Sequence, residues 1–127
     1  MQVRDAVEAD AGRLAELTDA PGDVMRNLIH DRTVRVAELD DEIVGFVSFD
    51  ARERTVHITQ IEGSTDACSR LLEEPMSFAT SENMAVELLV PESNDTVRTA
   101  VADAGFERDG TGPTFDGTPT VRFRYES

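Results

Sequence analysis

The chain has 127 residues, with 26 acidic side chains against 12 basic ones and a net charge of −14. This length fits one domain with a core of its own, and acids scattered along the chain exclude an acidic disordered tail. Nucleic-acid binding is disfavoured, because it needs a basic face.

A folded surface with this many acidic groups suits a medium in which salt screens the repulsion between them. We therefore expect a haloarchaea-like, high-salt cytoplasm. No apolar run is long enough to cross a bilayer, and the charged N-terminus is unlike a signal peptide. Cys68 is the only cysteine, which excludes an internal disulfide. The two histidines, His30 and His57, lack metal-ligand spacing, so no metal site is expected.

Hydrophobic periodicity and turn residues predict alternating strands and helices along the first half of the chain. The expected elements are an edge strand at 1–6, a helix at 7–18, a loop at 18–23, a helix capped by Asp23, and hairpin strands at 33–39 and 42–49 around Asp40-Asp41.

Residues 55–72 are the segment around which the other elements are arranged. A β-branched strand reaches Gly63, and Ser64 or Thr65 then caps a helix. A strand followed by a glycine turn and a capped helix directs free backbone N–H groups and the helix dipole at an anion. The same pattern also fits an ordinary connection between a strand and a helix.

The second half of the chain repeats the alternation. Pro75 is expected to end the helix that starts at 64, and the apolar run MAVELLV at 84–90 indicates a strand buried on both faces and parallel to the strand at 55–61. A helix capped by Ser93 or Asn94 should end at Gly105. A strand from 106, a loop over 110–119 and a final strand at 120–126 complete the chain.

Several of these stretches, taken in order, resemble the GNAT superfamily of N-acetyltransferases. VRDAVEADAGRLAEL at 3–17 is similar to the family's first strand and helix, and EIVGFV at 42–47 to its third strand. The end of the chain is similar to the family pattern N-x-x-A-x-x-x-Y-x-x-x-G-F. The matching positions are Asn94, Val97, Val101, Gly105 and Phe106.

The resemblance implies a single α+β domain over 1–127, with a mixed, largely antiparallel sheet of six to seven strands and about four helices. It also implies transfer of an acetyl group from acetyl-CoA to an amine of a small-molecule or protein acceptor. The loops at 18–23 and 110–119 would border the acceptor, and the acidic surroundings hint at a cationic amine. A homodimer that pairs through the final strand is a further expectation.

By the same resemblance, acetyl-CoA would contact the end of the strand at 55–61, the following loop and the helix after 93. The pyrophosphate loop falls on 63–68 in one register and on 60–65 in another. The residues implied are Ile58, Gly63, Ser64, Thr65, Asp66, Ala67, Cys68, Asn94 and Val101. Two of them depart from the family pattern. Asp66 replaces the central glycine of the loop, where its charge repels phosphate, and Val101 replaces a tyrosine acid.

His57 and Glu62 are the candidate general bases, because each lies on or at the end of the strand that the resemblance places beside the reaction. A structural role for either residue remains an alternative. Tyr125, the only tyrosine, lies on the final strand. Because Asp66 and Val101 fall on functional positions, the alternative function is a catalytically impaired domain that senses acyl-CoA or binds a protein.

Overall fold

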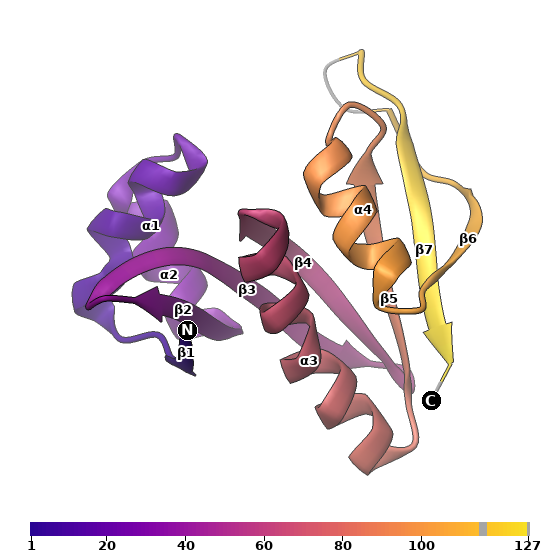
Figure 1. Cartoon of the computed structure of the whole chain (residues 1–127), viewed down its shortest axis with the longest axis horizontal. Coiled ribbons are helices and arrows are strands. Elements are labelled where there is room, and N and C mark those ends of the chain that lie inside the picture. The colour runs from indigo at the N-terminus through magenta and orange to yellow at the C-terminus, as the bar shows by residue number, and fades with distance from the viewer. Residues whose placement is uncertain (115–116, 127) are drawn as a thin grey trace.

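A seven-stranded mixed sheet runs through the molecule in the order β1-β2-β3-β4-β5-β7-β6 (Figure 1). The computed structural model describes residues 1–114 and 117–126. The strands are β1 Gln2–Asp5, β2 Thr33–Leu39, β3 Glu42–Arg52, β4 Thr55–Gly63, β5 Ala85–Pro91, β6 Glu107–Thr111 and β7 Thr120–Glu126. The helices are η1 Glu8–Asp10, α1 Ala11–Thr18, α2 Gly22–Asp31, α3 Thr65–Glu82 and α4 Asp95–Asp103. Among the described residues only β4 and β5 pair in parallel, so the predicted α+β class with a largely antiparallel sheet is confirmed.

Two tight hairpins join β2, β3 and β4. Asp40 and Asp41 have φ values of 52° and 65°, and Glu53 and Arg54 have 53° and 64°. Positive φ at both central residues gives a turn whose twist matches that of the strands it joins. The first hairpin was predicted; β3 extends to Arg52, beyond the strand end expected at residue 49.

The helices cover the sheet unequally. One core cluster packs α1 and α2 against β2 and β3, and its buried members are Ala11, Leu14, Met25, Val34, Val36, Ile43 and Phe46. A larger cluster packs α3 and α4 against the other face, with residues such as Val47, Phe49, Leu71, Val86 and Val101. Figure 1 shows α1 and α2 over the β2–β3 half, far from β5 and β7.

The expectation that β5 is buried on both faces is therefore wrong. Val86, Leu88 and Val90 enter the core, whereas Glu87 is half-buried and Leu89 is 41% exposed. Side chains of this strand alternate between the core and the open face as in any strand, but the sequence does not show it, because one of the outward residues is a leucine. One face of β5 is thus open to a ligand.

Three further expectations need correction. Pro75 does not end α3, which continues to Glu82; the buried ring packs in the core, and this packing outweighs the backbone hydrogen bond that proline cannot donate. Pro21 occupies the N-cap of α2, and Asp23 lies in its first turn. Strand β7 lies between β5 and β6, so it has no free edge through which a dimer could pair. Residues 115 and 116 of the loop predicted at 110–119 lie outside the described residues.

No helix among residues 1–114 and 117–126 combines the length and the apolar character that a membrane span requires.

Two glycines fix the start of α3 against the sheet. Gly45 on β3 pairs with Gly63 on β4, and a Cβ on Gly45 would lie 2.6 Å from the carbonyl oxygen of Glu62 and 3.3 Å from the Cβ of Ala67. Gly63 has φ of 139°, and a Cβ there would lie 3.1 Å from that of Ala67. The first turn of α3 therefore rests on bare backbone.

We expect Gly45→Ala to lower the free energy of unfolding by about 1–3 kcal/mol, because backbone atoms must move to admit the methyl group. Chemical denaturation measures the change. Gly12→Ala is the matched control: nothing beyond the adjoining backbone of its own helix lies within 4 Å of that Cβ, and alanine in a helix should raise stability by about 0.5–1 kcal/mol. Equal stability of Gly45→Ala and the parent would contradict the close packing.

Candidate functional site

The two parallel strands at the centre of the sheet pair over only part of their length. β4 pairs with β5 from Thr55 to Ile58, opposite Ala85 to Leu88, and the two strands then separate. Figure 1 shows β4 turning toward the start of α3 while β5 continues under α4. The edges that face each other beyond Ile58 therefore keep peptide groups without a strand partner.

A bulge in β4 marks the point of separation. Phe49 pairs with Ile58 and Ser48 with Gln60, so Thr59 is an extra residue in the ladder with β3. The hydroxyl oxygens of Ser48 and Thr59 lie 2.6 Å apart in a hydrogen bond. A bulge bends and twists its strand, which accounts for the departure of β4 from β5 at this residue.

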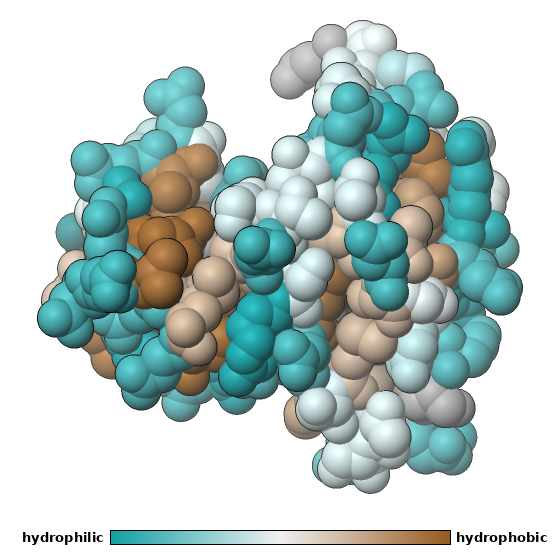
Figure 2. Space-filling model, viewed as in Figure 1, coloured by the Kyte–Doolittle hydropathy of each residue, from teal (hydrophilic) through white to brown (hydrophobic). Residues whose placement is uncertain are grey.

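A cavity of about 170 Å³ occupies the space between the separated strands. Its lining residues are Ile58, Thr59, Gln60, Ile61, Glu62, Leu88, Leu89, Val90, Pro91, Asn94 and Val97. The side chain of Asn94 caps α4 by accepting a hydrogen bond from the N–H of Val97 at 3.2 Å. The site thus combines apolar walls, unpaired strand edges and a helix start. Figure 2 shows the surface hollowed along the upper edge, between the α1–α2 end and the α4 end.

A second cavity, of about 390 Å³, opens on the face of β5 that α4 does not cover. It is lined by His57, Ile58, Thr59, Glu87, Leu88, Leu89 and Arg122. Four of these residues also line the first cavity: Ile58, Thr59, Leu88 and Leu89. The two cavities therefore meet at the point where the strands separate.

The start of α3 lies at the far end of β4. Ser64 is its N-cap and accepts a hydrogen bond from the N–H of Ala67 at 3.2 Å. The described part of the chain offers no acceptor for the N–H groups of Thr65 and Asp66. These two groups and the helix dipole favour an anion, whereas the exposed Asp66 carboxylate in the same turn opposes one.

The structure separates the two candidate bases. His57 lines the second cavity and Glu62 the first. Burial raises the pKa of Glu62, against a smaller lowering by a hydrogen bond from Gln60. At a strand rise of about 3.3 Å per residue, Glu62 lies roughly 10 Å along β4 from the bulge at Thr59.

Three other predicted residues lie off the cavities. Cys68 is fully buried, its Sγ lies 3.6 Å from the carbonyl oxygen of Gly63, and burial and the charge of Glu62 raise its thiol pKa to about 11. Val101 lies on α4 itself and is fully buried. Tyr125 packs against Phe106, with ring centroids 5.5 Å apart, and lines neither cavity. No group of three or more His, Cys, Asp or Glu side chains suited to a metal ion occurs among the described residues.

The sequence did not indicate Thr59, Leu89, Glu87 or Arg122 as site residues. An extra residue in a strand cannot be recognised within a run of β-branched residues. Leu89 lies in an apolar run, which predicts a core position. Arg122 was one arginine among twelve. Only the strand pairing brings these four side chains to one place.

Because the pKa of Glu62 is raised in the folded state, its ionisation opposes folding. Below the ordinary value of 4.5 the carboxyl is protonated whether the chain is folded or unfolded; above it the unfolded chain loses the proton first, and stability falls as pH rises through the folded pKa. We expect Glu62→Gln to raise the free energy of unfolding at pH 7 and this gain to vanish below about pH 4.5. Denaturation at a series of pH values measures it.

The control is Glu16→Gln, which removes the same charge from an exposed position on α1. An equal gain from both variants would mean that overall charge repulsion, and not burial of Glu62, is relieved.

The fold has many solved counterparts, although no family model and no curated protein sequence matches the chain. A ribosomal-protein-alanine N-acetyltransferase from Brucella melitensis aligns over 100% of both chains, with a TM-score of 0.83 and 16% identity. The Salmonella typhimurium protein yncA, solved with its cofactor acetyl-CoA, aligns over 98% of this chain and 92% of its own, with a TM-score of 0.81 and 14% identity. A GNAT-family acetyltransferase from Streptococcus pneumoniae aligns over 99% of both chains, with a TM-score of 0.75 and 18% identity. At these identities the likeness shows the fold alone: the chain has a GNAT-like α+β fold.

Proposed function

We propose that this protein is an N-acetyltransferase that uses acetyl-CoA and binds it between the separated ends of β4 and β5. The observation that supports this most is the cavity of about 170 Å³ bounded by the unpaired edge of β4, the end of β5 and the start of α4. Structural neighbours that share the fold include acetyltransferases, one of them solved with acetyl-CoA.

The residues present fit the pantetheine arm of CoA. That arm contains two amides, and an exposed strand edge offers N–H and C=O groups that can pair with amides as a neighbouring strand would. Residues 59–62 of β4 supply such an edge, and Val90 and Val97 supply apolar surface on the other wall. The long axis of acetyl-CoA would then follow β4 from the start of α3 to the bulge.

The pyrophosphate end fits less completely. The N–H groups of Thr65 and Asp66 can donate to a phosphate, but Ser64 already occupies the N–H of Ala67. The Asp66 carboxylate adds a like charge in the same turn. Gly63 adds no room for a ligand, because Ala67 and Gly45 fill the space beside it. Binding therefore rests more on the arm than on the phosphates, and salt that screens Asp66 should help it.

His57 is the better placed of the two candidate bases. When bound, acetyl-CoA supplies a thioester. The amine nitrogen forms a bond to the carbonyl carbon of its acetyl group, and the electron pair of the broken C–S bond leaves with sulfur. His57 lies one residue before the junction of the two cavities, and a nitrogen of its imidazole can accept the proton that the amine loses. Glu62 lies near the start of α3, at the opposite end of the β4 edge.

We expect His57→Gln to lower kcat about 10²–10⁴-fold, since that is the usual contribution of a positioned general base. Glu62→Gln is the comparison and should leave kcat within a few-fold. Release of free thiol from acetyl-CoA measures both. If Glu62→Gln caused the larger loss, the assignment of the base would have to be reversed.

Calorimetric titration of acetyl-CoA in multimolar KCl tests the function itself. We expect saturable binding that Leu89→Trp abolishes, because Leu89 lines both cavities and an indole would fill their junction. Leu39→Trp is the matched control at an equally exposed leucine on β2, where Leu89 is 41% and Leu39 46% exposed. Loss of binding in both variants would point to misfolding, and no binding by the parent protein would overturn the proposal.

The second candidate function, a domain that senses acyl-CoA or binds a protein without transferring acetyl groups, is favoured by one observation. Val101, at the position where the resemblance implies a tyrosine acid, is fully buried and cannot reach a ligand. Binding of acetyl-CoA without transfer to any amine would support this second function.

A further inference from the structure

The open face of the C-terminal half of the sheet carries two rows of side chains. In the first row His57 on β4 lies opposite Glu87 on β5, which lies opposite Arg124 on β7. In the second row Leu89 lies opposite Arg122. Because side chains alternate across a strand, all five project from the face that α4 does not cover. Both rows border the second cavity.

Arg122 has hydrogen-bonding capacity left over. The Oε2 atom of Glu87 accepts a bond of 2.9 Å from Nη1 of Arg124, whose Nε donates to Glu126 at 2.6 Å. Nε of Arg122 lies 3.7 Å from Oε1 of Glu87, which is beyond hydrogen-bond distance. Within residues 1–114 and 117–126 the Arg122 guanidinium has no hydrogen-bond acceptor.

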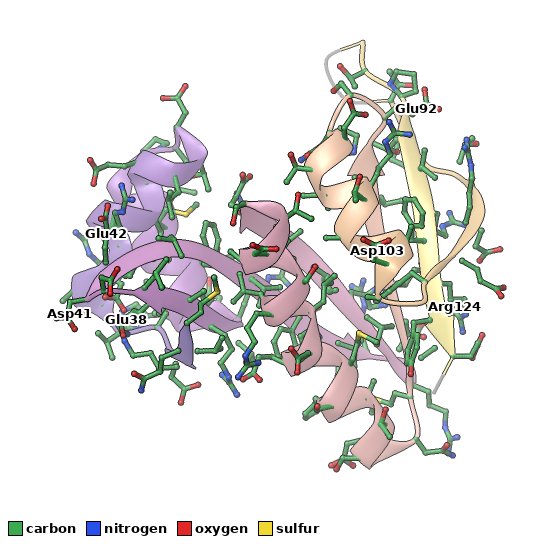
Figure 3. All side chains as sticks on the ribbon, viewed as in Figure 1. Glu38, Asp41, Glu42, Glu92, Asp103 and Arg124 are labelled. Carbon is green, nitrogen blue, oxygen red and sulfur yellow. The ribbon has the colours of Figure 1, made fainter. Side chains whose placement is uncertain are left out.

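That guanidinium lines a cavity of about 390 Å³ in which His57, Thr59 and Leu89 form other walls. Glu87 forms its closer ion pair with Arg124, at 2.9 Å against 3.7 Å for Arg122, so Arg122 brings to this cavity a guanidinium whose N–H groups can donate to an added anion. A guanidinium matches a carboxylate with two parallel hydrogen bonds. The net charge of −14 does not cancel this preference, because at ordinary ionic strength charges beyond about 10 Å are screened. Glu38, Asp41 and Glu42 gather at the β2–β3 end of the molecule, away from Arg124 on β7 (Figure 3).

We propose that the acceptor is an amine that also carries a carboxylate, such as an amino acid, and that Arg122 binds this carboxylate while the amine lies at the junction near His57. The proposal rests on the proposed acetyl transfer, since it names the acceptor of that reaction. It replaces the cationic amine that overall acidity suggests, because the guanidinium N–H groups of Arg122 next to the cavity can donate to an anion. Leu89, 41% exposed on the same wall, offers apolar contact to the acceptor's side chain.

The test uses pairs of ligands that differ only in the carboxylate. A panel of N-acetyl amino acids, the expected products, is titrated into the full-length protein beside the corresponding N-acetyl amino acid amides, with binding followed by NMR at constant ionic strength. The same amino acids and their amides serve as acceptors in the transfer assay. We expect the acids to bind and react in preference to the amides.

Arg122→Gln should weaken binding of the acids, and raise their KM, about 10–100-fold, the usual worth of hydrogen bonds to a charged group, and leave the amides unchanged. The matched control is Arg108→Gln, which removes the same charge from the neighbouring strand β6. Arg108 is 57% exposed, pairs with Glu92 at 3.6 Å and lines neither cavity.

Equal binding of acids and amides, no binding of any acid, or equal losses from Arg122→Gln and Arg108→Gln would overturn the proposal. The separate titration of acetyl-CoA distinguishes failure of the proposed function from failure of the acceptor assignment. If acetyl-CoA does not bind while the acids bind through Arg122, the cavity is a carboxylate site but transfer is refuted. If acetyl-CoA binds and amines are acetylated without regard to a carboxylate, transfer stands and the acceptor assignment fails.

Discussion

The separation of β4 from β5 after Ile58 is the constraint on which the rest of the site depends. Four paired residues hold the parallel strands together, and one extra residue, Thr59, turns β4 away. Had the ladder continued, the strand edges would satisfy each other and neither cavity would exist. The separation leaves polar backbone exposed in a cavity whose walls are in part apolar, which is costly unless water or a ligand pairs with it. A ligand with regularly spaced amides meets that need.

The sequence predicted the fold well because the fold depends on local patterns. Each local pattern indicates the structure of the few residues around it. Examples are the turn at Asp40-Asp41, the cap at Ser64 and the apolar stripe of Leu71 and Leu72, and the order of such patterns along the chain specifies the architecture. The failures have local causes too. Pro75 was read by its intrinsic preference, which core packing overrode, and Leu89 was read as core because hydropathy does not state which face a residue takes.

The site was harder to predict because it is made by pairing across strands. His57, Glu87 and Arg124 come from three strands, and they are aligned by the register of β4 with β5 and by the pairing of β5 with β7, the last strand in the sequence. A shift of one residue would turn each side chain to the other face. Composition misleads here as well, since overall acidity says little about a cavity where Arg122 pairs with Glu87 at 3.7 Å and, among the described residues, has no hydrogen-bond acceptor.

The positions that depart from the family pattern can vary without a change of fold. The start of α3 is held by the contact of Ala67 with Gly45 and Gly63, and by the Ser64 cap. Asp66 projects to solvent from the same turn and takes no part in either. Its charge therefore changes what the helix start can bind without changing where the helix lies. Val101 fills the core beneath α4 as any apolar residue of its size would. The fold thus persists whether or not the helix start binds a phosphate or α4 supplies an acid, so transfer under the proposed function would rest mainly on positioning along β4.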